Sequence, residues 1–304
     1  MTIADYPSFT KLTIDHKEIF DDFGRRHGHY CDFDFVDLFA WDIDSDVEVS
    51  MLNGNIVLKR REYLAGREYY SIFGVTRIDE SLTELLTATK ELELVPGVVV
   101  DSIKDLKKFN IVENRDSFDY IYDVDDIVNL NGTGYKKIRN KLNKFRREYG
   151  DIHKLKTVCS CSTDNEKSLS LRRVFEKWGS SRGLLSADTQ RELSAFDRMM
   201  QYCNILGLFI VEVWLGDDLL AFSVNHVAEP GYAITHFEKV KKVHDYFSTY
   251  VVNEVAKQQK ILGCDEVNWE DDLGFPGLRQ SKSSYCPKKM LKKFNISLGK
   301  DQVI

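Results

Sequence analysis

The chain has 304 residues, of which 43% are hydrophobic and 30% are charged, and its formal net charge is -6. This length and apolar content are typical of a globular protein with one large core or two smaller cores. The longest stretch without Asp, Glu, Lys or Arg runs from Met199 to Val211, which is shorter than the roughly 20 residues that cross a membrane, so we expect no transmembrane helix.

The first half of the chain reads as a β-hairpin followed by strands and one helix. Residues 47–52 and 56–64 flank the turn Asn53-Gly54-Asn55, and residues 69–75 form a third apolar run. A capping box from Ser81 to Glu84 predicts the start of a helix. Residues 93–101 are then expected to form another strand.

The middle segment, residues 135–149, holds seven Lys or Arg and one Glu. It is therefore +6, and the rest of the chain sums to -12. Its apolar residues recur at steps of three and four, which predicts a helix with one buried stripe; they are Tyr135, Ile138, Leu142, Phe145 and Tyr149. A solvated charged face is the usual explanation, but cations with few neighbouring acids also favour a polyanion partner such as RNA or phospholipid headgroups. The candidate nucleic-acid-binding residues are Lys136, Lys137, Lys141, Lys144 and Arg147.

The second half predicts the order β-α-α-β-β-β-α-β. Residues 154–160 read as a strand and two helical patterns follow, near 166–178 and 189–203. An antiparallel meander over residues 208–240 precedes a helix at 246–262 and a strand at 265–269. This order resembles the acyltransferase fold of the GNAT superfamily of N-acetyltransferases.

The two halves share one pattern, because Met51 aligns with Trp214 and Tyr69 with Tyr232 at the same offset of 163 residues. We therefore predict an α/β (α+β) protein of two tandem GNAT-like domains, each a mixed, mostly antiparallel sheet flanked by helices. The predicted domains are residues 1–128 and 129–304, and the second opens with the basic helix.

Three segments carry a more specific resemblance: YCDFDFVDLFAWD near the start, LNGTGYKKIRNKLNKF in the middle and EDDLGFPGLRQSKSSYCP near the end. Together they resemble the C-terminal domain of phosphatidylglycerol lysyltransferases, from about Leu12 to Ser297. That family is similar in architecture to the Fem peptidoglycan aminoacyltransferases. The resemblance implies transfer of an aminoacyl group from a charged tRNA to an amine or hydroxyl acceptor, such as an anionic lipid headgroup or a small molecule.

Carboxylates at strand ends are the candidate catalytic residues. Ligands collect at the carboxyl ends of strands in open α/β sheets, and acyl transfer needs a base whose pKa is raised toward neutrality. We expect Glu238, Glu270 and Asp272 to supply it, with mutual like-charge repulsion raising their pKa values. An acid here is also suited to hold the ammonium of an aminoacyl group.

The candidate substrate-binding residues follow the last strand or end the preceding one. Arg279 is suited to bind a carboxylate or phosphate with two hydrogen bonds, while Lys282 offers a point charge and Tyr285 a hydroxyl. Ser284 and His236 complete the set. The alternative is a turn at 271–274 in which Arg279 and Lys282 pair with its acids.

The donor is predicted to be aminoacyl-tRNA rather than coenzyme A. Coenzyme A dependent relatives bind pyrophosphate with a glycine-rich loop at a helix N-terminus, whereas residues 239–245 contain no glycine. We expect no bound cofactor and expect the first domain to act as a scaffold or as a wall of the acceptor site. A coenzyme A dependent N-acyltransferase and a non-catalytic module that binds RNA or an anionic surface remain the alternatives.

The N-terminus lacks a secretory pattern, so we expect a cytoplasmic protein whose six cysteines are reduced thiols. Cys159 and Cys161, and the His27, His29 and Cys31 cluster, lack the spacing of metal ligands. No metal site is predicted.

Overall fold

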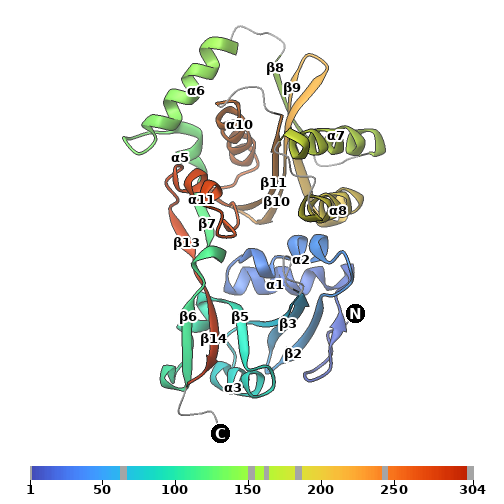
Figure 1. Cartoon of the computed structure of the whole chain (residues 1–304), viewed down its shortest axis with the longest axis vertical. Helices are drawn as coiled ribbons and strands as arrows, with labels where there is room; N and C mark the ends of the chain where they lie inside the picture. Colours follow the sequence, from blue (N-terminus) through green and yellow to red (C-terminus); the bar gives the residue numbers. More distant parts are fainter. Residues whose placement is uncertain are drawn as a thin grey trace. The chain divides into compact units, whose positions relative to one another are not determined.

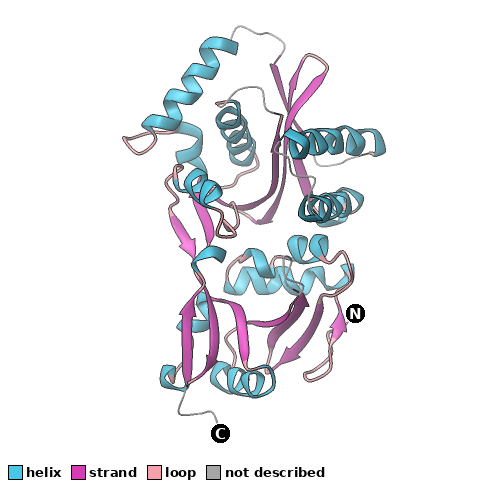
Figure 2. Ribbon diagram, in the orientation of Figure 1, coloured by secondary structure: helices cyan, strands magenta, loops and turns pink. Residues whose placement is uncertain are grey.

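The computed structural model describes residues 2–61, 67–149, 155–160, 164–181, 187–241 and 246–299. They form two compact units that interleave along the chain: unit 1 comprises Met1–Asp119, Asp271–Gly274 and Leu291–Ile304, and unit 2 comprises Tyr120–Glu270 and Phe275–Met290. Each unit combines strands and helices (Figure 2). The predicted boundary after residue 128 assumes a single crossing of the chain, and it stays a prediction.

Unit 1 contains two sheets. The first has the order β1-β2-β3-β4 and is antiparallel throughout, and the second has the order β5-β14-β6. The strands are β1 (Thr10–Lys11), β2 (Glu48–Leu52), β3 (Asn55–Arg61), β4 (Glu68–Phe73), β5 (Glu91–Pro96), β6 (Phe109–Glu113) and β14 (Lys293–Leu298). The helices are η1 (Ile14–His16), α1 (Lys17–His27), η2 (Cys31–Phe33), α2 (Phe35–Trp41), α3 (Ile78–Thr89), α4 (Gly97–Asp101), η3 (Leu106–Lys108) and η4 (Arg115–Ser117).

The hairpin predicted at the start of the first sheet is confirmed. Leu52 pairs with Asn55, which leaves Asn53 and Gly54 as a two-residue turn. Both turn residues have positive φ, at 53° and 81°, as a turn of the primed type requires.

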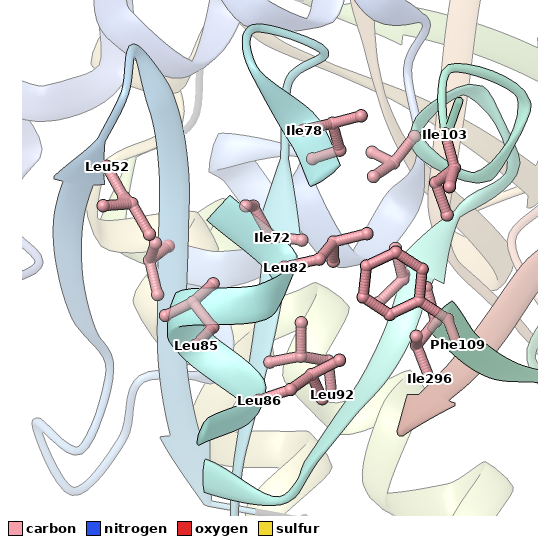
Figure 3. Close-up of a cluster of buried hydrophobic side chains, with 13 residues drawn as sticks. Leu52, Ile72, Ile78, Leu82, Leu85, Leu86, Leu92, Ile103, Phe109 and Ile296 are labelled. Carbon is pink, nitrogen blue, oxygen red and sulfur yellow. The ribbon is translucent and has the colours of Figure 1, made fainter. Parts of the chain in front are cut away.

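The core of unit 1 lies between α3 and both sheets (Figure 3). Leu82, Leu85 and Leu86 are buried on one face of α3, and they belong to one cluster with Ile72 of β4 and Ile296 of β14. The last strand of the chain is therefore part of the same core as the first half.

Two local predictions in unit 1 are wrong. Helix α3 begins at Ile78 after Arg77, which has left-handed geometry, so Ser81 lies inside the helix. The Ser81 hydroxyl donates to the carbonyl of Arg77 rather than capping the helix. The strand predicted over 93–101 ends at Pro96, because Gly97 opens α4.

Unit 2 is built on a seven-stranded sheet with the order β13-β7-β12-β11-β10-β9-β8. Helix α10 covers one face of its central strands, and α7 and α8 cover the other (Figure 1). The strands are β7 (Asp119–Asp123), β8 (Leu155–Ser160), β9 (Leu208–Leu215), β10 (Asp218–Glu229), β11 (Tyr232–Val240), β12 (Glu266–Asn268) and β13 (Lys289–Leu291). The helices are α5 (Val124–Asn129), α6 (Lys136–Tyr149), α7 (Asn165–Ser181), α8 (Ala187–Gln201), α9 (Cys203–Leu206), α10 (Phe247–Ile261) and α11 (Pro276–Ser283).

The order predicted for the second half is therefore confirmed, although its first strand was predicted to begin at Lys154, outside the described residues. Two described strands of this sheet, β7 and β13, were not predicted there from the sequence. Strand β7 comes from the end of the first half and pairs antiparallel with β12.

The basic segment forms α6, whose predicted apolar stripe is confirmed, since Ile138, Leu142 and Phe145 are buried. The Phe145 ring lies 4.5 Å from that of Tyr250 on α10. Among the described residues, no helix is both long and apolar enough to cross a membrane.

Candidate active site

Strand β11 pairs with β12 along only the first part of one edge. It pairs in parallel with β12 only from Tyr232 to Ile234, where the partners are Glu266 to Asn268. Among the described residues, the later part of β11, as far as Val240, pairs only with β10 on the other edge. This unpaired edge is where side chains from β11 and from the segment after β12 are available for a ligand.

A β-bulge at His236 sets the direction of the side chains along this edge. The register with β10 shifts between the pairs Val224–Phe237 and Asn225–Thr235, so His236 is an extra residue. Thr235 faces α10, since its hydroxyl hydrogen-bonds to Gln259. The extra residue reverses the alternation beyond it.

The bulge brings Glu238 to the same face as Thr235. In a regular strand two residues three positions apart lie on opposite faces. Glu238 instead pairs with Ser223, whose hydroxyl contacts Asn225 on the α10 face. Phe237 is directed to the other face, where its ring contacts that of Phe175 on α7.

Glu238 is a carboxyl group without a partner among the described residues. Burial raises its pKa from 4.5 to about 7, and neighbouring Lys239 opposes the rise only in part. The prediction that repulsion from Glu270 raises this pKa is therefore wrong, because desolvation of the carboxylate causes the rise.

Tyr285 lies on the same side of β11 and is buried. Desolvation raises the pKa of its hydroxyl, a hydrogen bond with Thr249 of α10 opposes the rise, and the charge of Glu238 adds to it. The hydroxyl is therefore a neutral donor at physiological pH. Its ring packs edge-on against Trp269, with centroids 5.2 Å apart.

On the opposite face, Glu270, His236 and His226 form a chain of hydrogen bonds. His236 Nδ1 lies 3.0 Å from Glu270 Oε1, and His236 Nε2 lies 2.8 Å from His226 Nδ1. The two imidazole planes differ by only 9°, so the lone pair and the N–H lie nearly in one plane. Two tetrahedral zinc ligands would be about 3.3 Å apart, so the shorter distance indicates a hydrogen bond.

The backbone of Glu270 is held in an unusual conformation. Its φ is 58°, in the left-handed region that costs a non-glycine residue free energy. The N–H of Glu270 donates to Asn268 Oδ1 at 2.6 Å, and its carbonyl accepts from the N–H of Tyr120 at 3.1 Å. These bonds fix where the Glu270 side chain starts, directly after β12.

Asp272, the third predicted catalytic acid, belongs to unit 1 and is fully buried. Its carboxylate accepts a hydrogen bond from the N–H of Gly274 at 3.0 Å and lies 3.2 Å from Arg115 Nη1. These contacts stabilise the 271–274 turn, although the alternative interpretation named Arg279 and Lys282, and not Arg115, as the cations that pair with its acids. A catalytic role for Asp272 stays a prediction.

The predicted binding residues of the last motif lie on or next to α11. The ammonium of Lys282 donates to the carbonyl of Trp269, which ties the helix to the end of β12. The Ser284 hydroxyl is exposed and donates to the carbonyl of Ser281 at 2.7 Å. Arg279 is partly exposed on the same helix. The structure thus brings Tyr285 beside Glu238 and uses Lys282 to hold the segment.

The five cations predicted to bind nucleic acid are all exposed on α6. Lys144 lies 4.7 Å from the ring centroid of Tyr246. The other four, Lys136, Lys137, Lys141 and Arg147, form no ion pair with any residue in the described parts of the chain. The remaining arginines of α6 serve the fold, since Arg139 donates to the carbonyl of Leu130 and Arg146 contacts Asn253.

Unit 1 holds a buried ionic cluster. Lys293 Nζ lies 2.7 Å from Asp119 Oδ1 and 3.1 Å from the sulfur of Cys31, and it also pairs with Asp32. The atoms of Cys31, Asp32 and Asp119 that could bind a metal ion lie close together. The Lys293 ammonium contacts all three residues and so takes the place of an ion there. This ionic cluster is suited to a structural role. The scaffold role expected of the first domain stays a prediction.

A sequence profile described as "Phosphatidylglycerol lysyltransferase, C-terminal" matches residues 26–297. The chain belongs to this family. Family membership supports acyl transfer as the general class of chemistry. No curated protein sequence matches the chain significantly.

Solved structures with low sequence identity share the fold. A conserved protein of unknown function from Bacteroides thetaiotaomicron is 21% identical with a TM-score of 0.80, covering 95% of this chain and 99% of that one. L-PGS from Bacillus licheniformis is 14% identical with a TM-score of 0.61, covering 99% and 95%. FemX is 11% identical with a TM-score of 0.55, covering 95% and 96%. The predicted fold class and family are therefore confirmed.

Sequence reasoning missed His226 and Thr249. Each lies inside a strand or helix with no motif around it, so its pattern is that of an ordinary core position. The one available signal was polarity, because a polar residue at a position expected to be buried needs a hydrogen-bond partner.

Proposed function

We propose that the protein is an acyltransferase that moves an aminoacyl group from an aminoacyl-tRNA to an amine or hydroxyl acceptor, with Glu238 as the general base. The observation that carries the proposal is the Glu238 carboxyl group, which has no hydrogen-bond or ion-pair partner among the described residues and lies on the part of β11 beyond its pairing with β12. Its pKa of about 7 makes it half ionised near neutral pH, which suits a group that must accept and then release a proton.

The reaction needs one proton to move in each direction. Glu238 takes the proton of the acceptor N–H or O–H while the nucleophile forms a bond to the acyl carbon. The bond between that carbon and the ribose oxygen of the tRNA then breaks, and the ribose oxygen receives the proton. The neutral Tyr285 hydroxyl supplies a donor for the oxygen that becomes negative during this exchange.

The donor part of the proposal rests on α6. Its five predicted cations extend along the helix from Lys136 to Arg147, about 17 Å. Phe145 and Arg146 anchor this helix to α10, so the cations are presented by a supported surface. A polyanion that contacts all five predicted residues would release counterions, and log K would fall with log salt with a slope of about -4.

A transfer assay tests the proposal. The full chain is incubated with tRNA charged with labelled amino acids, and with phosphatidylglycerol vesicles or ethanolamine as probe acceptors. Label is expected to leave the tRNA faster than by hydrolysis and to appear on an acceptor, and Glu238→Gln is expected to slow this by about 10²–10⁴-fold. Hydrolysis at the uncatalysed rate with every charged tRNA would refute it.

Two alternatives are separated by the same preparation. A coenzyme A dependent enzyme would be stabilised by acetyl-CoA in a thermal shift measurement; residues 242–245 of the loop that would bind its pyrophosphate lie outside the described residues. A binding module is favoured by the exposed cations of α6 alone, and it would bind tRNA in a salt-dependent manner without any turnover.

A further inference from the structure

We propose that Glu270, His236 and His226 form an ammonium-recognition relay, in which Glu270 binds the primary ammonium of the acyl substrate. His226 is then a positioning residue that acts through His236. The chemical identity of the substrate rests on the proposed function, whereas the site itself rests on the hydrogen bonds that join the three residues.

The hydrogen bonds restrict which ring nitrogens of the two histidines carry a hydrogen. A carboxylate only accepts, so His236 Nδ1 carries the hydrogen that points to Glu270. In a neutral His236 the Nε2 atom is then an acceptor, and His226 Nδ1 donates to it across 2.8 Å. Each ring sets the tautomer and orientation of the next, as a ring nitrogen does when its partner is fixed.

Exposure falls along the relay. The Glu270 side chain is 24% exposed, that of His236 is 1% exposed and His226 is 4% exposed as a residue. A ligand in solvent therefore meets Glu270 and not the histidines. The left-handed backbone of Glu270, with its N–H bonded to Asn268, holds the carboxylate at this position.

The chemistry of the exposed end selects a cation with several donors. A carboxylate that receives a hydrogen bond from His236 is favoured in its ionised form. A primary ammonium has three N–H donors and a full positive charge, and it is the one charged group common to unmodified aminoacyl esters. Acetylation of that amine removes the charge and two of the donors.

Binding of two small esters tests the relay without tRNA and without turnover. The full chain is labelled with ¹⁵N-histidine, and the His236 signals are assigned by their loss in His236→Gln. L-Alanine methyl ester is expected to shift these signals saturably, and N-acetyl-L-alanine methyl ester is not. Glu270→Gln is expected to weaken ester binding by about 10-fold or more, as for loss of a charged hydrogen bond.

Variants of His226 separate positioning from a general effect on folding. His226→Leu is expected to change the His236 signals and to weaken ester binding by about 3- to 10-fold. His226→Asn, whose amide N–H replaces Nδ1–H, is expected to restore both. Equal binding of the two esters, or wild-type binding by His226→Leu, would overturn the relay. Selective ester binding without any aminoacyl transfer would refute the proposed function and leave the relay standing.

Discussion

The ammonium of Lys293 lies 2.7 Å from the carboxylate of Asp119, and neither side chain is exposed. Asp119 also accepts hydrogen bonds from the N–H and the thiol of Cys31, both at 2.9 Å. Residues from the start, the middle and the end of the chain thus meet in one ionic cluster in unit 1, which secures β14 beside β5 and β6.

Lys293→Met is expected to destabilise the protein strongly. It leaves the carboxylates of Asp32 and Asp119 without their counter-ion, and breaking a buried pair in this way costs about 3–5 kcal/mol. Urea unfolding at pH 7 measures the change. The matched control is Lys292→Met, because Lys292 and its partner Glu113 are both about half exposed, and the loss there should stay below about 1 kcal/mol. Equal losses in the two variants would contradict this account.

Glu238→Gln is expected to stabilise the protein above pH 7. The folded-state pKa of Glu238 is raised from 4.5 to about 7. Below pH 4.5 the carboxyl is protonated in both states and costs nothing; between pH 4.5 and 7 it ionises only in the unfolded chain, so the free energy of unfolding falls as pH rises. The expected gain of the variant at pH 8, allowing for partial exposure, is on the order of 1–2 kcal/mol. No gain at pH 8 relative to pH 4 would count against desolvation as the cause of the raised pKa of Glu238.

The rate of acyl transfer is expected to rise with pH through about 7 in the wild type, since Glu238 must be ionised to accept a proton. This rise of the rate with pH should disappear in Glu238→Gln, leaving a low and pH-independent rate. A pH–rate profile under saturating acceptor measures it. If the rate of the variant rises with pH as in the wild type, another residue is the general base.

Charge reversal on α6 is expected to weaken tRNA binding without affecting the fold. Lys137→Glu with Lys141→Glu removes two exposed cations and adds two acids. The slope of log K against log salt should therefore become less steep by the amount expected for about two lost phosphate contacts. Filter binding over a salt series measures the slope. The matched control is Lys104→Glu with Lys107→Glu, since both residues are exposed in unit 1. A similar loss in the control would indicate a general charge effect.

Asp272→Ala is expected to lower the free energy of unfolding by about 2–4 kcal/mol, because it removes a buried carboxylate and leaves the Gly274 N–H without its acceptor. Asp272→Asn retains an acceptor oxygen and should cost less. Urea unfolding of both variants gives the comparison. Full stability of Asp272→Ala, with transfer abolished, would instead support the catalytic role predicted from the sequence.

The sequence by itself determined those turns and helices that depend on residues close together along the chain. The Asn53-Gly54 turn follows from residues that tolerate positive φ, and α6 follows from apolar residues at steps of three and four. The Ser81 capping box failed because the helix starts three residues earlier. The motifs around residues 268–290 pointed to the correct family, and Glu238 was found because its strand was predictable.

Tertiary structure alone decided what the side chains of those elements meet. The bulge at His236 arises from the register between β10 and β11, and it sends Glu238 and His236 to opposite faces. The contact between His226 and His236 depends on the same pairing, and Lys293 reaches Asp119 only because β14 enters the sheet of unit 1. These contacts depend on the register between strands, and the periodicity of a single segment carries no information about that register.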